Sequence, residues 1–364
     1  MNADEKTQLA GIPTLVAFAA ALVGLIAIVF PSGEQYASLT NVRGPDRYSI
    51  AYLEVLTRAN PKEVELRLLY VRQLAQLGQF EEALRQLEPV LKAKEHDAEV
   101  KNLLFDILLA RGRALASNDP KRRDIFARIS SLLDDLLLVH QNVPRLCELA
   151  QVALALERPK LAAEYWILAA QNGDAQEQAK RFAEAARWLR ASGEELRSAQ
   201  YYRKASEVES DPKRRRDWAG LAIDSLESEN KIEEASDLAI VYANQFSDDV
   251  DIVSRAARLA TACSRHEEAR DWGRRLIAIS PESDAILEAQ VSRELAAKDL
   301  QMALHWAHRL VQRNPNSVAF RESEAHIAEW AGKFDWALQD WLWLVKRGGI
   351  SKLGKGRPPV GVKP

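Results

Sequence analysis

His305 and His308 have the spacing that comes nearest to a chemical site, because side chains three residues apart on a helix share a face. Two imidazoles on one face could ligate a divalent metal ion. No Asp, Glu or Cys at a matching spacing completes such a set, and the metalloprotease pattern HExxH is absent. We therefore expect surface or interface histidines and no metal site.

Paired glutamates could serve as a general acid and base, and they recur at one position of a repeating segment. These pairs are Glu81-Glu82, Glu233-Glu234 and Glu267-Glu268. Acids also stabilise helix N-termini, which explains a recurring position better than catalysis does. The sequence has no GxxxxGK[ST], GxGxxG or GxSxG pattern. Cys147 and Cys263 lie far apart in apolar stretches, as expected for buried free thiols. The sequence predicts no enzyme and no cofactor.

Acidic and basic residues nearly cancel. The 50 Lys and Arg and the 52 Asp and Glu give a formal net charge of −2. Such a balance provides no field that attracts nucleic acid, so no nucleic acid is expected as a partner. One basic run, Lys213–Arg216, is expected in a turn between repeats. There it is either solvated or in contact with an anion or a partner.

The positions of small residues indicate a repeated helical unit. Strong helix formers dominate the composition, and Gly (16) and Pro (14) are scarce for 364 residues. An alanine recurs near the start of the second helix of each unit. These alanines are Ala83, Ala163, Ala199, Ala235, Ala269, Ala303 and Ala337. From the second to the last, 199 − 163 and 235 − 199 give 36, and the next three differences give 34. A period near 34 residues indicates one family of helical hairpins.

These segments resemble the tetratricopeptide (TPR) repeat, which has a Gly before its turn, an aromatic residue after it and a small residue in its second helix. The matching residues are Gly78, Phe80 and Ala83 in one repeat and Gly332, Phe334 and Ala337 in another. Middle repeats depart from the pattern, since His266 replaces the aromatic residue and Lys298 the glycine. The resemblance implies an all-α, right-handed α-solenoid over residues 47–347, with about eight hairpins and a groove that binds other proteins.

Residues 98–147 do not keep the period. Asp119–Arg123 is expected as the loop between two longer helices, the second covering Ile125–Val139. We interpret this stretch as one enlarged hairpin. The residues before it, from Asp46 to about Lys94, are expected to form a lead-in helix and one ordinary hairpin.

No charged residue occurs between Lys6 and Glu34, and Thr14–Phe30 is apolar apart from Thr14 and Gly24. With the preceding residues, this stretch reaches the ~20 residues that span a bilayer core. We expect an uncleaved transmembrane anchor at residues 11–31, between a short tail (1–10) and a linker (32–46). A cleaved signal peptide would need a basic start and a better cleavage site than Ala37. A buried core helix would normally have a polar face.

A second resemblance concerns the cell envelope. Residues 49–56, 60–61, 65–68 and 77–78 are similar to the start of the periplasmic repeat region of the PelB family of exopolysaccharide export proteins, which follows one membrane helix. Residues 161–165 and 183–188 are similar to later parts of it. The resemblance implies a single-pass bacterial inner-membrane protein with a periplasmic array, acting as a scaffold in an envelope complex of the Pel export type.

The chain departs from the PelB family in one respect, because that family continues into an outer-membrane β-barrel. No alternating ten-residue strands occur here, so an export pore is not expected. Orientation stays open, since Lys6 on one side against Arg43 and Arg47 on the other favours a cytoplasmic array by a single charge. The alternative function is a structural subunit of another membrane complex. In that case small residues of the anchor would pack on partner helices, namely Ala17, Ala20, Ala21 and Gly24.

The end of the array carries four tryptophans. They are Trp330, Trp336, Trp341 and Trp343. They either fill the last layer between helices or form a docking surface, since Trp is enriched at interface hot spots. Residues 348–364 carry four basic residues and no acid, with many Gly and Pro. This tail is expected to be solubilising or to order on a partner.

Overall fold

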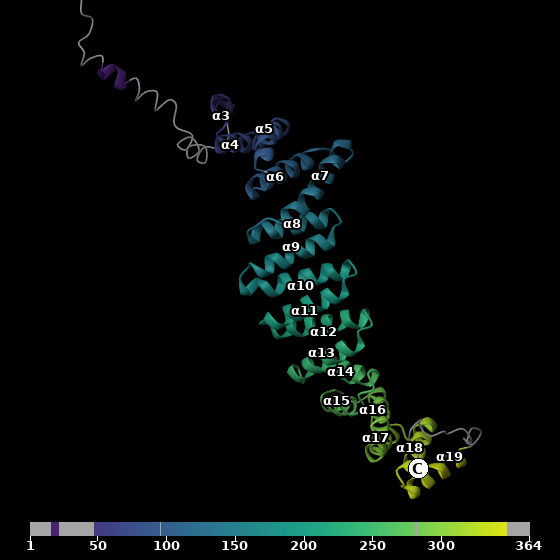
Figure 1. Cartoon of the computed structure of the whole chain (residues 1–364). Coiled ribbons are helices and arrows are strands. Elements are labelled where there is room, and N and C mark those ends of the chain that lie inside the picture. The colour runs from purple at the N-terminus through teal and green to yellow at the C-terminus, as the bar shows by residue number, and fades with distance from the viewer. Residues whose placement is uncertain (1–15, 22–46, 95, 281–282, 348–364) are drawn as a thin grey trace, which may run out of the picture. The chain divides into compact units, whose positions relative to one another are not determined.

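The computed structural model describes residues 16–21, 47–94, 96–280 and 283–347, and within these ranges it contains helices and no strand (Figure 1). The predicted all-α fold is therefore confirmed for the described residues. Of the predicted anchor at 11–31, only residues 16–21 are described, and they are helical and exposed. The rest of the anchor, residues 1–10 and 32–46 and the tail 348–364 lie outside the described ranges. No helix among the described residues has the length and apolar character needed to cross a membrane.

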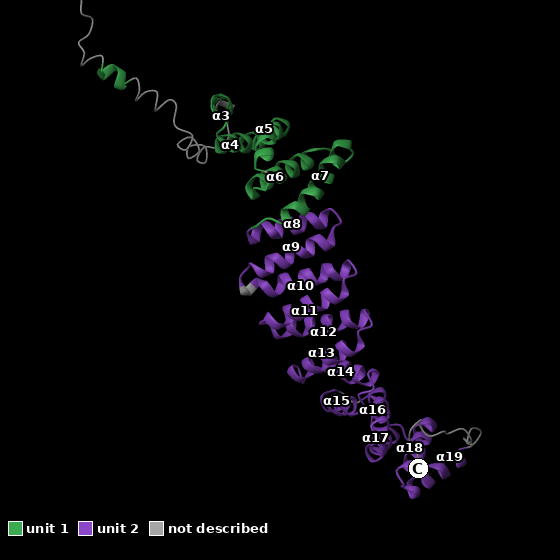
Figure 2. Cartoon of the chain, in the orientation of Figure 1, with its two compact units in different colours: residues 1–141 green, residues 142–364 purple. Residues whose placement is uncertain are grey.

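The chain divides into two compact units, residues 1–141 and 142–364 (Figure 2). Beyond the helical residues 16–21, the described part of the first unit is a single helix followed by two helical hairpins. The single helix is α3 (Arg47–Ala59), and the hairpins are α4 (Val64–Gln76) with α5 (Phe80–Ala93), and α6 (Ala98–Ala114) with α7 (Pro120–Leu137). The second hairpin has the longer helices, as the break in the period predicts.

The described part of the second unit contains six hairpins in sequence, and each helix packs on the next one along the chain (Figure 1). The first three hairpins are α8 (Val143–Ala155) with α9 (Pro159–Gln171), α10 (Ala175–Ala191) with α11 (Glu195–Val208), and α12 (Pro212–Ser228) with α13 (Ile232–Gln245). The last three are α14 (Val250–Ala262) with α15 (His266–Ile279), α16 (Asp284–Ala296) with α17 (Leu300–Arg313), and α18 (Val318–Trp330) with α19 (Phe334–Lys346).

The aligned alanines lie near the start of the second helix in seven of the described hairpins. All seven, from Ala83 to Ala337, are buried. Seven residues after each of several of them comes a second buried position. These residues are Val90, Ala170, Tyr242, Leu276, Leu310 and Leu344. A small side chain permits close packing of neighbouring helices, and except at Ala170 the buried residue two turns later is larger.

Seven hairpins make the same turn between their helices. One residue of each turn adopts a left-handed conformation with φ between 57° and 77°, and the next backbone N–H closes a bond to the carbonyl five residues back. Glycine stands at this position only as Gly78, Gly193 and Gly332. The other hairpins use Glu157, Asn230, Ser264 and Lys298. The degenerate repeats therefore keep the turn geometry and lose only the residue type that suits it.

Replacing Lys298 by Gly is expected to raise the free energy of unfolding by about 0.5–1 kcal/mol. The left-handed conformation costs a non-glycine residue roughly 1–2 kcal/mol, and part of that gain is offset by the greater chain entropy of unfolded glycine. Thermal or urea unfolding followed by circular dichroism measures the change. Ala297→Gly is the matched control, since Ala297 has φ −79° and glycine there should destabilise. A stabilising Ala297→Gly would contradict the conformational explanation.

Two stretches expected as loops are helix starts instead. Asp119 and Asp211 each precede a proline, and each accepts a hydrogen bond from the backbone N–H two residues on, at 2.8 Å. An Asp cap followed by Pro at the first helical position is a strong start signal. The predicted loop Asp119–Arg123 and the predicted turn at Lys213–Arg216 are therefore wrong: α7 begins at Pro120 and α12 at Pro212.

Candidate functional site

The four C-terminal tryptophans do not form one surface. Trp330 and Trp341 pack against the apolar core of the last two hairpins, with the His326 ring next to both. Trp341 Nε1 also donates to Glu329 Oε1 at 2.8 Å. Trp343 lies between two guanidinium groups, with Arg321 4.6 Å and Arg347 4.5 Å from its ring centre. These three fit the interpretation of a packed last layer.

Trp336 is different, because it is 45% exposed and lines a hollow. Its ring lies 5.1 Å from that of His308, centre to centre. The hollow has a volume of about 460 Å³ and lies among α17, α18 and α19. Its other lining residues are Val311, Gln312, Pro315, Arg321, Glu324, Gln339 and Asp340. We call it the Trp336 pocket.

Two buried carboxylates form the inner wall of the Trp336 pocket, and each has a basic partner. His308 Nδ1 lies 2.5 Å from Glu324 Oε1, and Arg321 Nη1 donates to Asp340 Oδ1 at 2.7 Å. With Gln312 Nε2 donating to His308 Nε2 at 2.9 Å, the Nδ1–H of the neutral ring donates to Glu324. Burial raises the pKa of Glu324, and the nearby charge of Asp340 adds to the effect.

Replacing Glu324 by Gln is expected to stabilise the protein relative to wild type as the pH rises above about 4. A raised pKa means that folded Glu324 holds a proton that the unfolded chain releases above its ordinary pKa of ~4.3. Wild type therefore loses stability as the pH rises above that value, and Glu324→Gln cannot. Melting temperatures of the two proteins at several pH values measure the difference. Glu288→Gln, an exposed carboxylate outside the pocket, is the control. A constant difference between Glu324→Gln and wild type would contradict the raised pKa.

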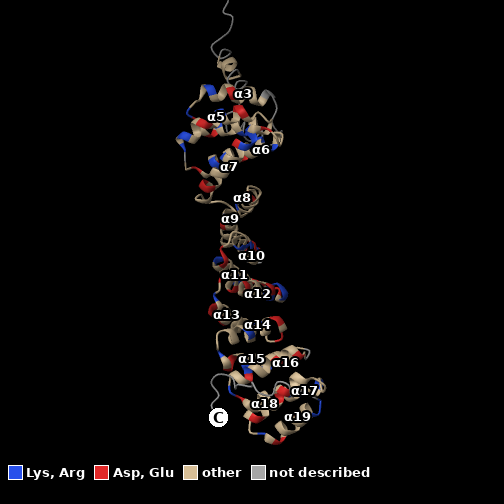
Figure 3. Ribbon diagram, turned by 90° about the vertical axis from the view of Figure 1, so that its right-hand side faces the viewer, with Lys and Arg blue, Asp and Glu red and all other residues tan. Residues whose placement is uncertain are grey.

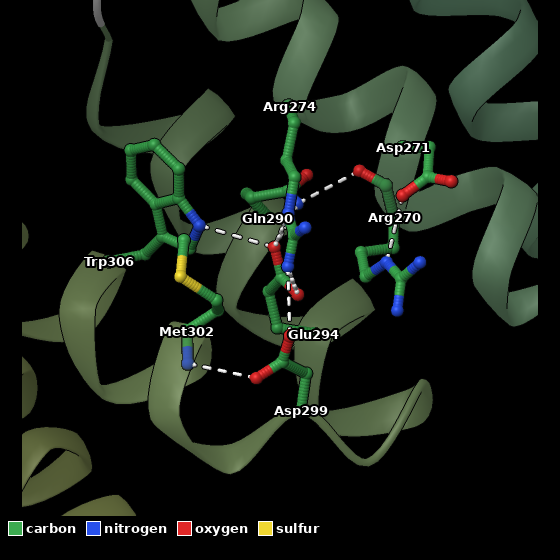
Figure 4. A network of polar contacts seen from close by, with 8 residues as sticks. All are labelled: Arg270, Asp271, Arg274, Gln290, Glu294, Asp299, Met302 and Trp306. Carbon is green, nitrogen blue, oxygen red and sulfur yellow. Dashed lines mark hydrogen bonds and ion pairs between the residues drawn. The ribbon is translucent and has the colours of Figure 1, made fainter.

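A network of polar contacts fixes the hairpins that lead to the pocket (Figure 4). The Glu294 carboxylate on α16 is fully buried and accepts two hydrogen bonds from Arg274 on α15, at 2.7 and 2.8 Å. It also accepts from Trp306 Nε1 on α17 at 3.2 Å and from Gln290 at 2.7 Å. Arg274 donates further to Asp299, whose carboxylate caps α17. Three consecutive helices are thus joined through one carboxylate.

Two further hollows lie between other hairpins of the second unit. One, of about 480 Å³, lies between α11 and α13 and exposes Leu196 and Val241. The other, of about 340 Å³, lies between α12 and α14, where Arg255 pairs with Asp224. Figure 3 shows acidic and basic residues interspersed over the helices of both units. The Trp336 pocket differs from these two in combining an exposed aromatic ring with buried acids.

The other residues that the sequence singled out for chemistry lie apart from one another. Among the described residues no group of three His, Cys, Asp or Glu side chains could hold a metal ion. His305 lies edge-on to Trp306, with ring centres 4.9 Å apart, and His308 belongs to the Trp336 pocket. Cys147 and Cys263 are both free and half-buried. In the basic run, Arg214 forms an ion pair with Glu209, and Arg216 forms ion pairs with Asp248 and Asp249. Two of its four charges are therefore paired with acids of the repeats.

Several of these residues could have been found from the period of 34. Glu294 aligns with Ala260 and Ala328, both fully buried, so a carboxylate there stands at a core position. Glu324 aligns in the same way with Gln290 and Ala256. Gly273 aligns with Ala239 and Ala307 as another small position, and a Cβ at Gly273 would fall 1.8 Å from Gln290 Oε1. The period predicts which positions are buried, whereas the bonding partners need the structure.

Comparisons with known proteins agree with the repeat geometry in one region. Residues 49–107, which run from the first turn of α3 into α6, match the tetratricopeptide repeat family. A comparison of the sequence with curated proteins found no match. Among solved structures, a thermophilic TPR protein of Thermus thermophilus aligns at 19% identity over 52% of this chain and 94% of that chain, with a TM-score of 0.31. The pilF protein of Pseudomonas aeruginosa aligns at 15% identity over 62% and 99%, with a TM-score of 0.30.

These two structural alignments are too loose to carry detail, so the fold is inferred from the chain's own helices. Eight consecutive hairpins are described, seven share one turn geometry, and their small residues recur with one period. Residues 49–107 match the tetratricopeptide repeat family, and the described residues form an all-α, TPR-like helical repeat fold.

Proposed function

We propose that this protein is a scaffold that holds other proteins through pockets between its helical hairpins, and that it is not an enzyme. Hairpins of this kind are rigid supports that present side chains from successive helices to a partner. Protein–protein interaction is the role that tetratricopeptide repeats imply. The observation that carries the proposal is the Trp336 pocket, where an exposed aromatic ring borders buried hydrogen-bonding groups.

The chemistry of the Trp336 pocket fits a peptide segment of a partner. An apolar side chain would cover the Trp336 ring, and a donor such as an amide or a lysine would approach Glu324 or Asp340 from the open side. Aromatic residues at the edge of a pocket commonly dominate the binding energy of such contacts. Glu324 and Asp340 already have His308 and Arg321 as partners, so the pocket needs no ligand to satisfy its two buried carboxyl groups.

We propose further that residues 11–31 anchor the protein in a bacterial inner membrane, with the repeats in the periplasm. The apolar composition of this segment and the similarity to the PelB family support this, and Pel-type exopolysaccharide export is the envelope process that the similarity suggests. A reporter enzyme that is active only in the periplasm, fused after Pro364, should be active. Activity of a cytoplasmic reporter at the same place would reject the periplasmic arrangement.

Partner binding can be tested in cells with the photo-reactive amino acid p-benzoylphenylalanine in place of Gln339, an exposed residue of the Trp336 pocket. Irradiation should give a discrete cross-linked product that mass spectrometry identifies. The same substitution at Glu288, exposed on α16 and outside the pocket, is the control and should give none. No product from the Gln339 position, a product made only of two copies of this chain, or identical products from both positions would count against the pocket as a binding site for another protein.

The alternative is a structural subunit that joins a membrane complex through its anchor. Ala17, Ala20 and Ala21 lie in the described helical stretch and offer a small-residue face. Exchanging residues 11–31 for an unrelated membrane helix separates the two functions. A scaffold that acts through its pockets should keep the Gln339 cross-link after the exchange, whereas a subunit that packs through its anchor should lose its complex.

A further inference from the structure

The last described helix, α19, exposes an apolar stripe, part of which is buried at the aligned positions of α17. Phe334, Leu338, Leu342 and Val345 of α19 are 69%, 58%, 50% and 44% exposed. Their spacing of 4, 4 and 3 residues places them on one helical face along the whole length of α19. A contiguous apolar face that is exposed to solvent is typical of an interaction site. We call it the α19 stripe.

The preceding hairpin shows what normally covers this face. Leu338 and Val345 align, at the 34-residue period, with Leu304 and Val311 of α17. Those two residues are only 3% and 4% exposed, because α17 packs against α18 of the next hairpin. Successive helices of the array alternate in direction, so the natural cover of the α19 stripe is a helix that runs antiparallel to α19.

The sequence of α19 is complementary to itself when two copies are antiparallel. A two-fold axis at about residue 340 would bring Leu338 to Leu342 of a second copy and Phe334 to Val345, since both pairs are centred within one residue of 340. Asp335 and Lys346 lie on one flank of the stripe and are centred there too. In a two-fold antiparallel pair, this flank of one helix faces the same flank of the other. Asp335 of each copy therefore lies opposite Lys346 of the other, which gives two symmetric ion pairs.

Neither charge is used elsewhere in the described part of the chain. Asp335 and Lys346 are both exposed, and no ion pair of either is found within the described residues. We propose that two copies of this protein associate through their α19 stripes as an antiparallel, two-fold symmetric helix pair. Trp336 lies on another face of α19, whereas Gln339 lies on the same flank as Asp335 and Lys346, four residues after the first and seven before the second.

The size of the contact predicts its strength. A helix of 13 residues is about 20 Å long, so two of them bury less than the ~1,200 Å² of a standard stable interface. We therefore expect a reversible dimer whose register is set by the Asp335–Lys346 pairs and whose affinity comes mainly from the four apolar residues.

Charge reversal tests the register. Two differently tagged copies of the full chain are produced together, and capture of one tag measures the other copy. The variants are Asp335→Lys and Lys346→Asp. Either variant alone places like charges opposite each other and should lower co-capture with itself at least about five-fold. Asp335→Lys produced together with Lys346→Asp restores both pairs, so their co-capture should return to the wild-type amount. Glu288→Lys on α16 is the control for an exposed charge reversal and should have no effect.

Three results would overturn the proposal. Wild-type copies that do not capture each other would exclude the dimer. Co-capture that survives each single reversal would exclude this register. Deleting residues 348–364 provides a further measurement: if co-capture is absent in the full chain and arises only after the deletion, the tail and not a second copy covers the stripe. Unchanged or only slightly altered co-capture after the deletion agrees with the proposal.

Discussion

Replacing Arg274 by Leu is expected to lower the free energy of unfolding by about 3 kcal/mol, because it leaves the fully buried Glu294 carboxylate without its cation. Arg274 donates two hydrogen bonds to this carboxylate and one to Asp299. Gln290 and Trp306 still donate to Glu294 in the variant, but neither is charged. The pKa of Arg274 is raised chiefly by its hydrogen bond to Glu294, in agreement with strong coupling of the pair. Chemical unfolding followed by circular dichroism measures the loss.

Two further variants separate the buried charge from general effects of losing an arginine. Arg203→Leu removes the partner of Glu207 in an exposed pair and should cost no more than about 0.5 kcal/mol. The double variant Arg274→Leu with Glu294→Leu removes both charges and should recover part of the stability, since the aligned positions Ala260 and Ala328 are apolar. If Arg274→Leu costs as little as Arg203→Leu, the carboxylate is not buried as described.

The buried positions of the repeats could be predicted from the sequence, because they recur with the period of the repeat. A repeat that can cover its apolar face only with its neighbour must keep the same small and apolar positions in each copy. The positions from Ala163 to Ala337 could therefore be aligned by subtraction, and all are buried. The enlarged hairpin of α6 and α7 was recognisable for the same reason, since it breaks that period.

Helix starts and turns were harder, because they depend on backbone conformation and on capping side chains. The Asp-Pro pairs that begin at residues 119 and 211 are themselves a sequence signal for a helix start. They are easily interpreted as a loop and a turn, because basic residues follow each pair. At Lys298 and Glu157 no such signal exists, since neither residue type favours the left-handed conformation it adopts. The turn is imposed there by the packing of the two helices that it joins.

The candidate site could be only partly predicted, because the number of tryptophans does not show which way each side chain points. Four tryptophans within two helices indicate an aromatic end of the array, yet they face three different surroundings. Trp336 lines the pocket because α17 supplies His308 opposite it, a contact between segments 28 residues apart in sequence (336 − 308). Helical periodicity within α19 alone cannot show which of its faces another helix covers.

Replacing Ala235 by Leu is expected to lower the free energy of unfolding by about 1–3 kcal/mol, because the added carbon atoms enter a filled core. Ala235 is fully buried in the apolar cluster that α12, α13 and α14 share. Ala285→Leu on the exposed face of α16 is the matched control and should change the free energy by less than about 0.5 kcal/mol. Equal effects of the two would contradict close approach of the helices at the aligned alanines.

The position of an alanine in the array should also matter. In a linear repeat array each hairpin is stabilised by its neighbours on both sides, so a defect in the middle weakens two interfaces. Ala235 lies in such a hairpin, whereas Ala337 lies in the last described one. Ala337→Leu is therefore expected to reduce the helical signal of the terminal hairpin with a smaller shift of the main unfolding transition, when measured at low protein concentration. If Ala337→Leu shifts the main transition as much as Ala235→Leu, the second unit unfolds in one cooperative transition. In that case α19, which carries the α19 stripe, unfolds together with the other helices of the unit.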